Sequence, residues 1–295
     1  MRNYHDKYYK RIFSVPIFVE KLLTSFVHEE FVNFLDFKTL KKINKSFVTK
    51  KFKYRESDLI YEIYYKDRPF YIYLLLEFQS TNDKKMPLRF LRYILELYED
   101  HDLGAGNKNY PALFPLLLYN GEIKWSAKIN IADTIEHNIP NKYIPHFEYY
   151  PILINEIDKS ELLKINNAVS AIFYMENTSS IEYHKAIDDL VLIIKDSSII
   201  EVKVFAKWVN HFFIHNGLEL NDNDYTKILN AEEALSMMAA EIDRYKKKLL
   251  DEGKLEGKLE QKITMAKKLL KEGAEIDFVV KITELSKDEI IKLKI

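Results

Sequence analysis

The chain has 295 residues, of which 47% are hydrophobic, 30% charged and 14% aromatic. This composition excludes a disordered or collagen-like chain and is typical of a globular protein of one or two domains. The absence of cysteine excludes a disulfide framework, a thiolate zinc site and a cysteine nucleophile. Residues 70–76 form the longest strongly apolar run, far below the roughly 20 residues of a spanning helix, and the charged N-terminus has no apolar export core. We therefore expect no membrane partner and a cytoplasmic location.

Positive charge is concentrated at the front of the chain. Residues 1–55 contain 13 Lys+Arg against 5 Asp+Glu, a net charge of +8, whereas the whole chain carries −1. Lysines alternate with aromatic residues over residues 38–55, and Lys50, Lys51 and Lys53 are candidate DNA contacts because such a pattern suits a phosphate-facing surface. An exposed helix end and a lysine-protected strand edge explain the pattern equally well.

Apolar periodicity predicts the elements of the first half. Val19, Leu23, Val27 and Phe31 recur every four residues, which predicts a helix over residues 16–36 with proline in its first turn. A weak strand at residues 46–54 precedes two strong strands at 58–65 and 70–79, separated by a turn at 66–69.

A second helix and a further strand follow. The helix, over residues 86–102, should present Leu88, Leu91, Leu95 and Tyr98 on one face. The apolar residues 112–121 then predict a buried strand parallel to an earlier one. The predicted order is α, β, β, β, α, β.

The second half should be helical, because all 8 prolines lie at or before Pro151. A strand is expected at residues 146–155 and helices over 160–250.

In the tail, the repeat at residues 252–261 keeps Leu255, Leu259 and Ile263 at helical spacing, although each glycine costs about 1 kcal/mol in a helix. Three short helical pieces follow, the last opened by a capping box of Ser286 and Glu289. Such a tail reads DNA or self-associates. The balance of 14 Lys+Arg against 12 Asp+Glu from residue 241 onward favours a homo-oligomer.

Two carboxylates mark the strong strands. If Tyr65 pairs with Phe70 across the turn, Asp58 lies directly opposite Glu77, and a divalent cation would relieve their repulsion. Gln79 falls on the same face as Glu77. Oxygen ligands without His or Cys suit Mg²⁺ or Mn²⁺. The alternative is that Glu77 is an edge carboxylate and Asp58 a turn residue.

These segments resemble a known family. Asp58, an apolar strand and then Glu77-Phe78-Gln79 look like the D…ExQ form of the PD-(D/E)XK nuclease motif. HDKYYKRIF at the N-terminus, Arg55, LLLEFQS, MPLRFLRY, FPLLLYNG and the glycine-punctuated tail resemble the Rpn/YhgA-like recombination-promoting nucleases, formerly grouped with transposases.

The resemblance implies a Mg²⁺-dependent DNA endonuclease that acts in DNA recombination. Asp58, Glu77 and the carbonyl of Phe78 would hold the ion, and Gln79, where the wider superfamily usually has lysine, would orient the attacking water. Arg55, Arg89 and Arg92 are candidate DNA contacts, with surface ion pairing as the alternative for the two helical arginines. His5 and Asp6 match the family's opening, and Glu56 is a candidate ligand for a second ion.

The expected organisation is a nuclease-like PD-(D/E)XK α/β domain at residues 1–155, a helical region at 156–250 and an oligomerising tail at 251–295. The alternatives are a catalytically weak DNA-binding or assembly protein of the same fold, and an RNase. No glycine-rich phosphate loop supports a nucleotide cofactor. Trp125 and Trp208 are expected to be core or interface anchors.

Overall fold

The structure is a computed structural model that describes residues 8–43, 59–77, 83–100, 109–178, 183–194, 196–215 and 231–293. The chain divides into two compact units, Met1–Leu235 and Ser236–Ile295. In the part of the chain just given, no helix has both the length and the apolar character needed to cross a bilayer. The domain bounds 1–155, 156–250 and 251–295 remain a prediction.

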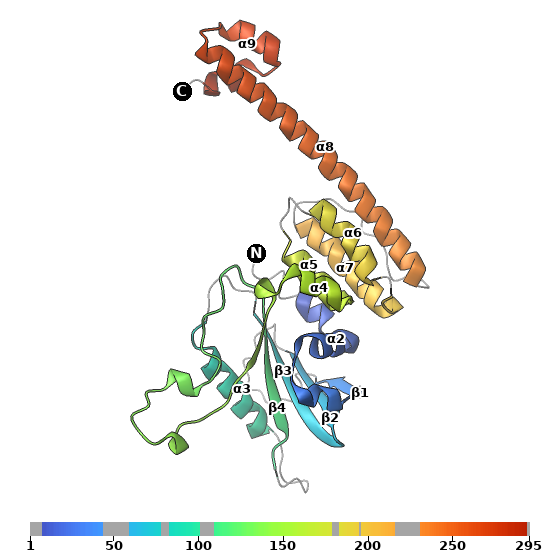
Figure 1. Cartoon of the computed structure of the whole chain (residues 1–295), viewed down its shortest axis with the longest axis vertical. Helices are drawn as coiled ribbons and strands as arrows, with labels where there is room; N and C mark the ends of the chain where they lie inside the picture. Colours follow the sequence, from blue (N-terminus) through green and yellow to red (C-terminus); the bar gives the residue numbers. More distant parts are fainter. Residues whose placement is uncertain are drawn as a thin grey trace. The chain divides into compact units, whose positions relative to one another are not determined.

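The first unit is built on a five-stranded mixed sheet with strand order β1-β2-β3-β4-β5 (Figure 1). The pairs β1–β2 and β2–β3 are antiparallel, whereas β3–β4 and β4–β5 are parallel. The strands are β1 (Leu35–Lys42), β2 (Leu59–Tyr65), β3 (Arg68–Glu77), β4 (Ala112–Tyr119) and β5 (Tyr150–Leu153). The predicted α/β class, the two strong strands and the parallel pairing of β4 are confirmed.

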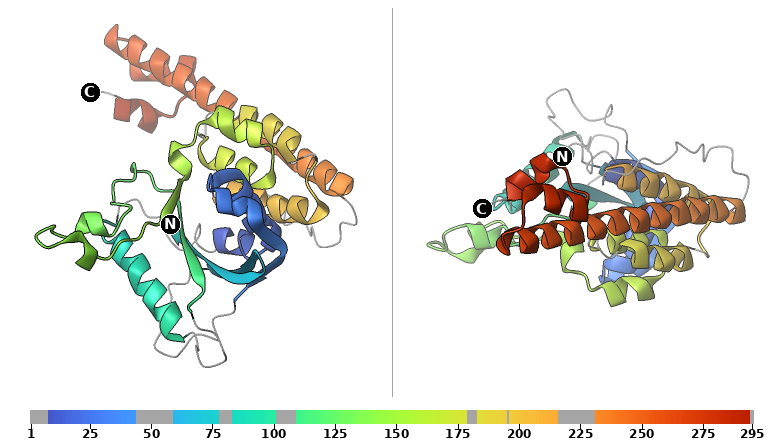
Figure 2. Two further views of the ribbon diagram at one scale, coloured as in Figure 1. Left: turned by 60° about the horizontal axis from the view of Figure 1, so that its bottom comes forward. Right: turned by 90° about the horizontal axis from the view of Figure 1, so that it is seen from above.

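Helices cover both faces of this sheet. Figures 1 and 2 show α3 on one face and α2 on the other. Phe26 of α2 packs on Phe173 of α5, with ring centroids 4.9 Å apart. Among the described residues of the unit, 8–12 are helical, and the longer helices are α2 (Pro16–Phe26), α3 (Met86–Asp100), α4 (Lys159–Ile165), α5 (Ala168–Glu176), α6 (Tyr183–Ile194) and α7 (Ile199–His215). The predicted helical second half is confirmed.

The helix predicted over residues 16–36 is too long. It ends at Phe26, and a short 3-10 turn at Glu30–Phe34 leads into β1. At the end of the helix the backbone hydrogen-bonds to a side chain: the Tyr150 hydroxyl donates to the Phe26 carbonyl and accepts from the His28 amide. Phe31 then packs on Phe114, with centroids 4.9 Å apart, so tertiary contacts override the four-residue period. The weak strand expected at residues 46–54 lies outside the described residues.

The β2–β3 hairpin has a different register from the predicted one. Tyr65 pairs with Arg68, not with Phe70, and Leu59 pairs with Leu74. The turn contains only Lys66 and Asp67, with φ of 47° and 62°. Positive φ at both central residues is the type I′ geometry, whose twist matches that of the strands. The predicted four-residue turn, and with it the pairing that set Asp58 opposite Glu77, is therefore wrong.

The predicted apolar face of α3 is wrong at Leu88 and Leu95, although Tyr98, also predicted, packs against the core. Leu88 and Leu95 are 56% and 54% exposed, whereas the buried face is formed by Met86, Phe90, Tyr93 and Leu97. Tyr93 stacks on Tyr73 of β3 with centroids 5.2 Å apart, so aromatic packing selects this face. The core beneath α3 contains Ile60, Tyr73, Leu75, Leu117, Tyr119, Trp125 and Tyr149.

Both tryptophans are core residues, as predicted. Trp125 is 8% exposed and donates through Nε1 to the Tyr149 hydroxyl at 3.0 Å. Trp208 is 4% exposed in α7.

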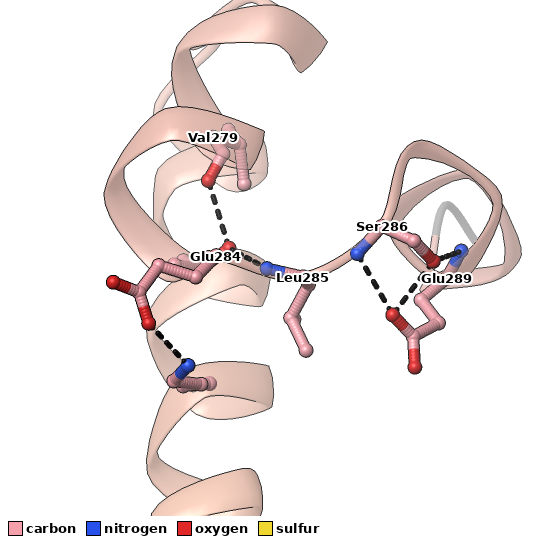
Figure 3. Close-up of polar contacts among 7 residues, drawn as sticks. Val279, Glu284, Leu285, Ser286 and Glu289 are labelled. Atoms are coloured by element: carbon pink, nitrogen blue, oxygen red, sulfur yellow. Dashed lines mark hydrogen bonds and ion pairs between the residues drawn. The ribbon is translucent and has the colours of Figure 1, made fainter.

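The second unit is a small helical cluster at the end of a long helix. Helix α8 (Ala231–Lys271) runs unbroken through both glycines of the repeat, and α9 (Ile276–Thr283) and α10 (Lys287–Leu293) follow it. Their core contains Ala266, Val279, Leu285 and Ile290. The predicted capping box is confirmed: Glu289 accepts from the Ser286 amide at 2.8 Å, and the Glu289 amide donates to the Ser286 hydroxyl at 3.3 Å (Figure 3).

Candidate active site

Glu77 is the last residue of β3 and lies at the carboxyl edge of the sheet. Tyr73 and Leu75 of this strand belong to the core under α3, and the alternation of a strand assigns position 77 to the same face. Glu77 pairs with Tyr119, the last residue of β4. Carboxyl ends of neighbouring parallel strands are where open α/β sheets place their ligands.

The N-terminus of α3 lies at the same edge. Residues 78–85 connect Glu77 to Met86, and the helix must run back along the sheet for β4 to pair in parallel with β3. Arg89, in the first part of α3, donates through Nη1 to Asp83 Oδ2 at 2.9 Å, and its side chain is only 14% exposed. Asp83 also accepts from the Lys85 amide at 3.0 Å. One carboxylate therefore both supports the start of the helix and fixes Arg89.

Arg92 lies in a different environment on the same helix. Its side chain is 69% exposed, and Nε donates to Glu96 Oε1 at 2.7 Å. This hydrogen bond is the main reason why the pKa of Arg92 is raised above its usual value. Both arginines thus make the ion pairs that were the alternative to phosphate contact. Their contact with DNA remains a prediction.

Most of the predicted site lies outside the described residues. This holds for Asp58, Phe78, Gln79, Glu56, Arg55, Lys50, Lys51, Lys53, His5 and Asp6. Over the residues that are described, no three His, Asp or Glu side chains gather into a group that could hold a metal ion. The structure therefore gives the place of Glu77 at the end of β3 and the surroundings of Arg89 and Arg92.

A partly buried polar cluster of Tyr9, Asn120 and Glu176 lies near this edge and was not predicted from the sequence. Tyr9 is fully buried, and burial, followed by the negative charge of Glu176, raises the pKa of Tyr9 well above its usual value. Asn120 directly follows Tyr119 and donates to Glu176 Oε2 at 3.1 Å. Asn120 could have been found from the sequence, because it is a polar residue directly after an apolar strand. No sequence pattern marks Tyr9 or Glu176 as members of this cluster.

Comparison with known proteins identifies the family. Residues 3–202 match the family described as "Putative transposase, YhgA-like". The chain is 32% identical over 117 residues to the recombination-promoting nuclease RpnA of Escherichia coli K12, and 29% identical over 118 residues to RpnC of the same strain. It is also 29% identical over 118 residues to RpnE, named an inactive recombination-promoting nuclease-like protein, again from that strain.

These alignments are partial. Each covers 40% of this chain, together with 40% of RpnA and 39% of RpnC and RpnE, so the chain spans well under half the length of the curated relatives it matches. No solved structure matches. The family match, in contrast, extends from residue 3 through the sheet and into α7, and the chain therefore belongs to the YhgA-like family.

Proposed function

We propose that this protein is a metal-dependent DNA endonuclease that hydrolyses phosphodiester bonds in DNA recombination or mobile-element activity. The observation that carries the proposal is the position of Glu77 at the carboxyl end of β3, where this strand pairs in parallel with β4. The succession α2, β1, β2, β3, α3, β4 fits a PD-(D/E)XK-type core. Relatives named recombination-promoting nucleases support the same activity.

In this proposal the Asp58 and Glu77 carboxylates and the Phe78 carbonyl hold Mg²⁺, or Mn²⁺ in its place. These are oxygen donors, which suit a hard cation. The ion would polarise the phosphate and lower the pKa of a bound water. Gln79 orients the attacking water by hydrogen bonding but brings no positive charge. Arg89, held by Asp83 near this edge, is the described cation best placed to bind the phosphate.

The test is conversion of supercoiled plasmid to nicked or linear DNA with Mg²⁺, with Mn²⁺ and with EDTA. The wild-type chain should cut only with a divalent ion, and Asp58→Ala and Glu77→Ala should each lose cutting because a ligand is removed. Glu30→Ala is the matched control: Glu30 is exposed, and its neighbour Phe31 packs on Phe70 near the start of β3, at the opposite end from Glu77. Folded Asp58→Ala or Glu77→Ala protein that cuts at the wild-type rate would contradict the metal assignment.

A second candidate is a DNA-binding or assembly protein of the same fold with little or no turnover. It is favoured by one observation, the similarity to a relative that is itself named inactive. Under this alternative the chain retards DNA in a gel at low salt but leaves plasmid supercoiled in Mg²⁺ and Mn²⁺. Cutting of RNA but not DNA in the same buffers would instead support an RNase.

A further inference from the structure

Asp83 lies between the strand that carries Glu77 and the helix α3, and the sequence did not mark it as a site residue. Its main-chain carbonyl accepts from the amide of Met86, the first residue of α3, at 3.0 Å. Its Oδ1 accepts from the Lys85 amide, also at 3.0 Å. Both hydrogen bonds satisfy amides at the start of the helix, so Asp83 fixes the first turn of α3.

The other carboxylate oxygen of Asp83 holds a side chain of the same helix. Oδ2 accepts from Arg89 Nη1 at 2.9 Å, and the side chains of Arg89 and Asp83 are 14% and 29% exposed. The Arg89 amide donates to the Lys85 carbonyl at 3.0 Å. Asp83 therefore holds Arg89 both directly and through Lys85. A guanidinium carries five N–H donors in a rigid fork, so holding one of them sets the direction of the others.

Arg92 offers a comparison within the same helix. Its partner Glu96 lies one turn further along α3, not at the start of the helix, and the Arg92 side chain is 69% exposed. Water and salt screen such a pair, and it fixes neither side chain firmly. The pair of Asp83 and Arg89 differs in both respects, because it is largely buried and because its carboxylate is itself anchored on the backbone.

We propose that Asp83 is a positioning residue for phosphodiester cleavage, and that it directs the guanidinium of Arg89 toward the phosphate at the cutting site. This inference rests on the proposed function, because it requires a DNA phosphate at the carboxyl edge of the sheet that ends in Glu77. Asp83 contacts no substrate in this role. It acts through Arg89, whose oriented donors stabilise the charge that develops on the phosphate.

This role gives Asp83 opposite effects on binding and on cutting. A carboxylate near the DNA repels its phosphates and lowers affinity. The same carboxylate orients Arg89 before the reaction and so raises the rate. A residue that served only as a helix cap would show neither effect on replacement by asparagine, because asparagine caps helices about as well as aspartate.

The first experiment compares Asp83→Asn with the wild type in single-turnover plasmid nicking at saturating Mg²⁺, and in binding of a DNA duplex in EDTA. The asparagine oxygen can still accept from the Lys85 amide, but its NH₂ group then faces Arg89, donor against donor. Cutting should slow roughly tenfold or more, whereas affinity should stay equal or rise. Glu96→Gln is the matched control: it removes the same charge from an arginine pair on the same helix and should leave the cutting rate unchanged.

A double-mutant cycle tests whether Asp83 acts through Arg89. Arg89→Ala should slow cutting at least as much as Asp83→Asn, and Asp83→Asn added to Arg89→Ala should cause no further loss. Losses that multiply would overturn the proposal. Arg89→Lys approaches the same pair from its other side, because lysine keeps the charge but not the fork. It should bind DNA and cut slowly, and it carries the test if Asp83→Asn does not fold; a folded Arg89→Lys that cuts at the wild-type rate would overturn the proposal.

The outcomes separate this inference from the function on which it rests. Folded Asp83→Asn that cuts at the wild-type rate, or that loses affinity and rate together, would overturn the role of Asp83. The metal assignment would stand in that case, provided that Asp58→Ala and Glu77→Ala still lose cutting. A wild-type chain that cuts DNA with neither Mg²⁺ nor Mn²⁺ would overturn the proposed function and, with it, this role of Asp83.

Discussion

Arg89 and Arg92 lie three residues apart on α3 but differ in how freely they can leave their partners. Arg92 is 69% exposed, and an exposed ion pair such as that with Glu96 contributes little to stability because water and salt screen it. Exchange of Glu96 for a DNA phosphate would therefore cost little. Arg89 is 14% exposed and hydrogen-bonded to Asp83, so its position is fixed before any ligand arrives. Arg89 is the better candidate for orienting a phosphate, and Arg92 for general attraction.

Gln79 tests the assignment of site residues at the level of one side chain. Strand alternation gives it the face of Glu77, so Gln79→Leu should leave DNA binding nearly intact and reduce cutting roughly 10²-fold or more, as for loss of a positioning or electrostatic group. Gln79→Lys should retain some activity. The measurement is single-turnover plasmid nicking at saturating Mg²⁺.

Phe78→Leu is the control for this prediction, because the neighbouring position belongs to the opposite face of the strand. It should change stability more than the metal-dependent rate. Full activity of Gln79→Leu beside folded but inactive Phe78→Leu would mean that the strand faces the other way.

At the scale of the element, the glycines of α8 should be replaceable with a gain in stability. Gly253 and Gly257 lie inside the helix with open space around a Cβ, so Gly253→Ala and Gly257→Ala should each stabilise it by about 1 kcal/mol. Hydrogen exchange of α8 amides in the full chain would measure this as slower exchange. Gly273→Ala is the control and should destabilise the α8–α9 connection, because Gly273 has a φ of +85°. Unchanged exchange in both α8 variants would contradict the prediction.

Acid should loosen the helical cluster at the end of α8. The Ser286 hydroxyl and amide donate to Glu289 and lower the pKa of that carboxyl, and Lys262 lowers the pKa of Glu284. Both folded values lie below the ordinary 4.5. Their contribution is therefore complete above about pH 4.5 and is lost as the pH falls through the folded values. Protection of α9 and α10 amides from exchange should fall accordingly.

Glu289→Gln keeps the shape of the cap without a titrating group. The acid loss of α10 protection should then become smaller than in the wild type. An identical pH profile in wild type and variant would show that Glu289 makes no such contribution.

The elements were more predictable from sequence than their exact pairing. Long apolar runs were sufficient to place β2, β3 and β4, since burial on both faces leaves few alternatives. The hairpin register was predicted wrongly because a two-residue turn is usually recognised by Asn-Gly or another glycine pair. Here Lys66 and Asp67 form the turn, both with positive φ. The face of α3 was missed because leucines at 88 and 95 repeat as regularly as the buried residues, and only tertiary packing distinguishes them.

In the candidate site, too, local features could be predicted from the sequence and contacts between distant segments could not. The place of Glu77 at the end of an apolar strand could be predicted, because the apolar run that forms β3 is local, whereas the face of its side chain stays a prediction. The expected opposition of Glu77 and Asp58 depended on an assumed alignment of β2 with β3, and over the described residues these strands pair with a register that differs from the assumed one by two residues. The support of Arg89 by Asp83 brings a loop residue to a helix residue, and hydrophobic periodicity does not encode such a contact.

At the scale of the whole molecule, all the proposed catalytic residues lie before Asn155, whereas the tail expected to self-associate, residues 251–295, lies in the second unit, Ser236–Ile295. A chain truncated after Tyr245 loses the larger part of α8 together with α9 and α10, but keeps all of Met1–Leu235. It should therefore be monomeric by light scattering and still nick plasmid in Mg²⁺, because no proposed ligand or phosphate contact is removed. Single-turnover nicking, compared with the full chain at equal concentrations of active sites, measures this. A folded, monomeric truncation that no longer nicks, beside an active full chain, would instead show that cutting requires the second unit.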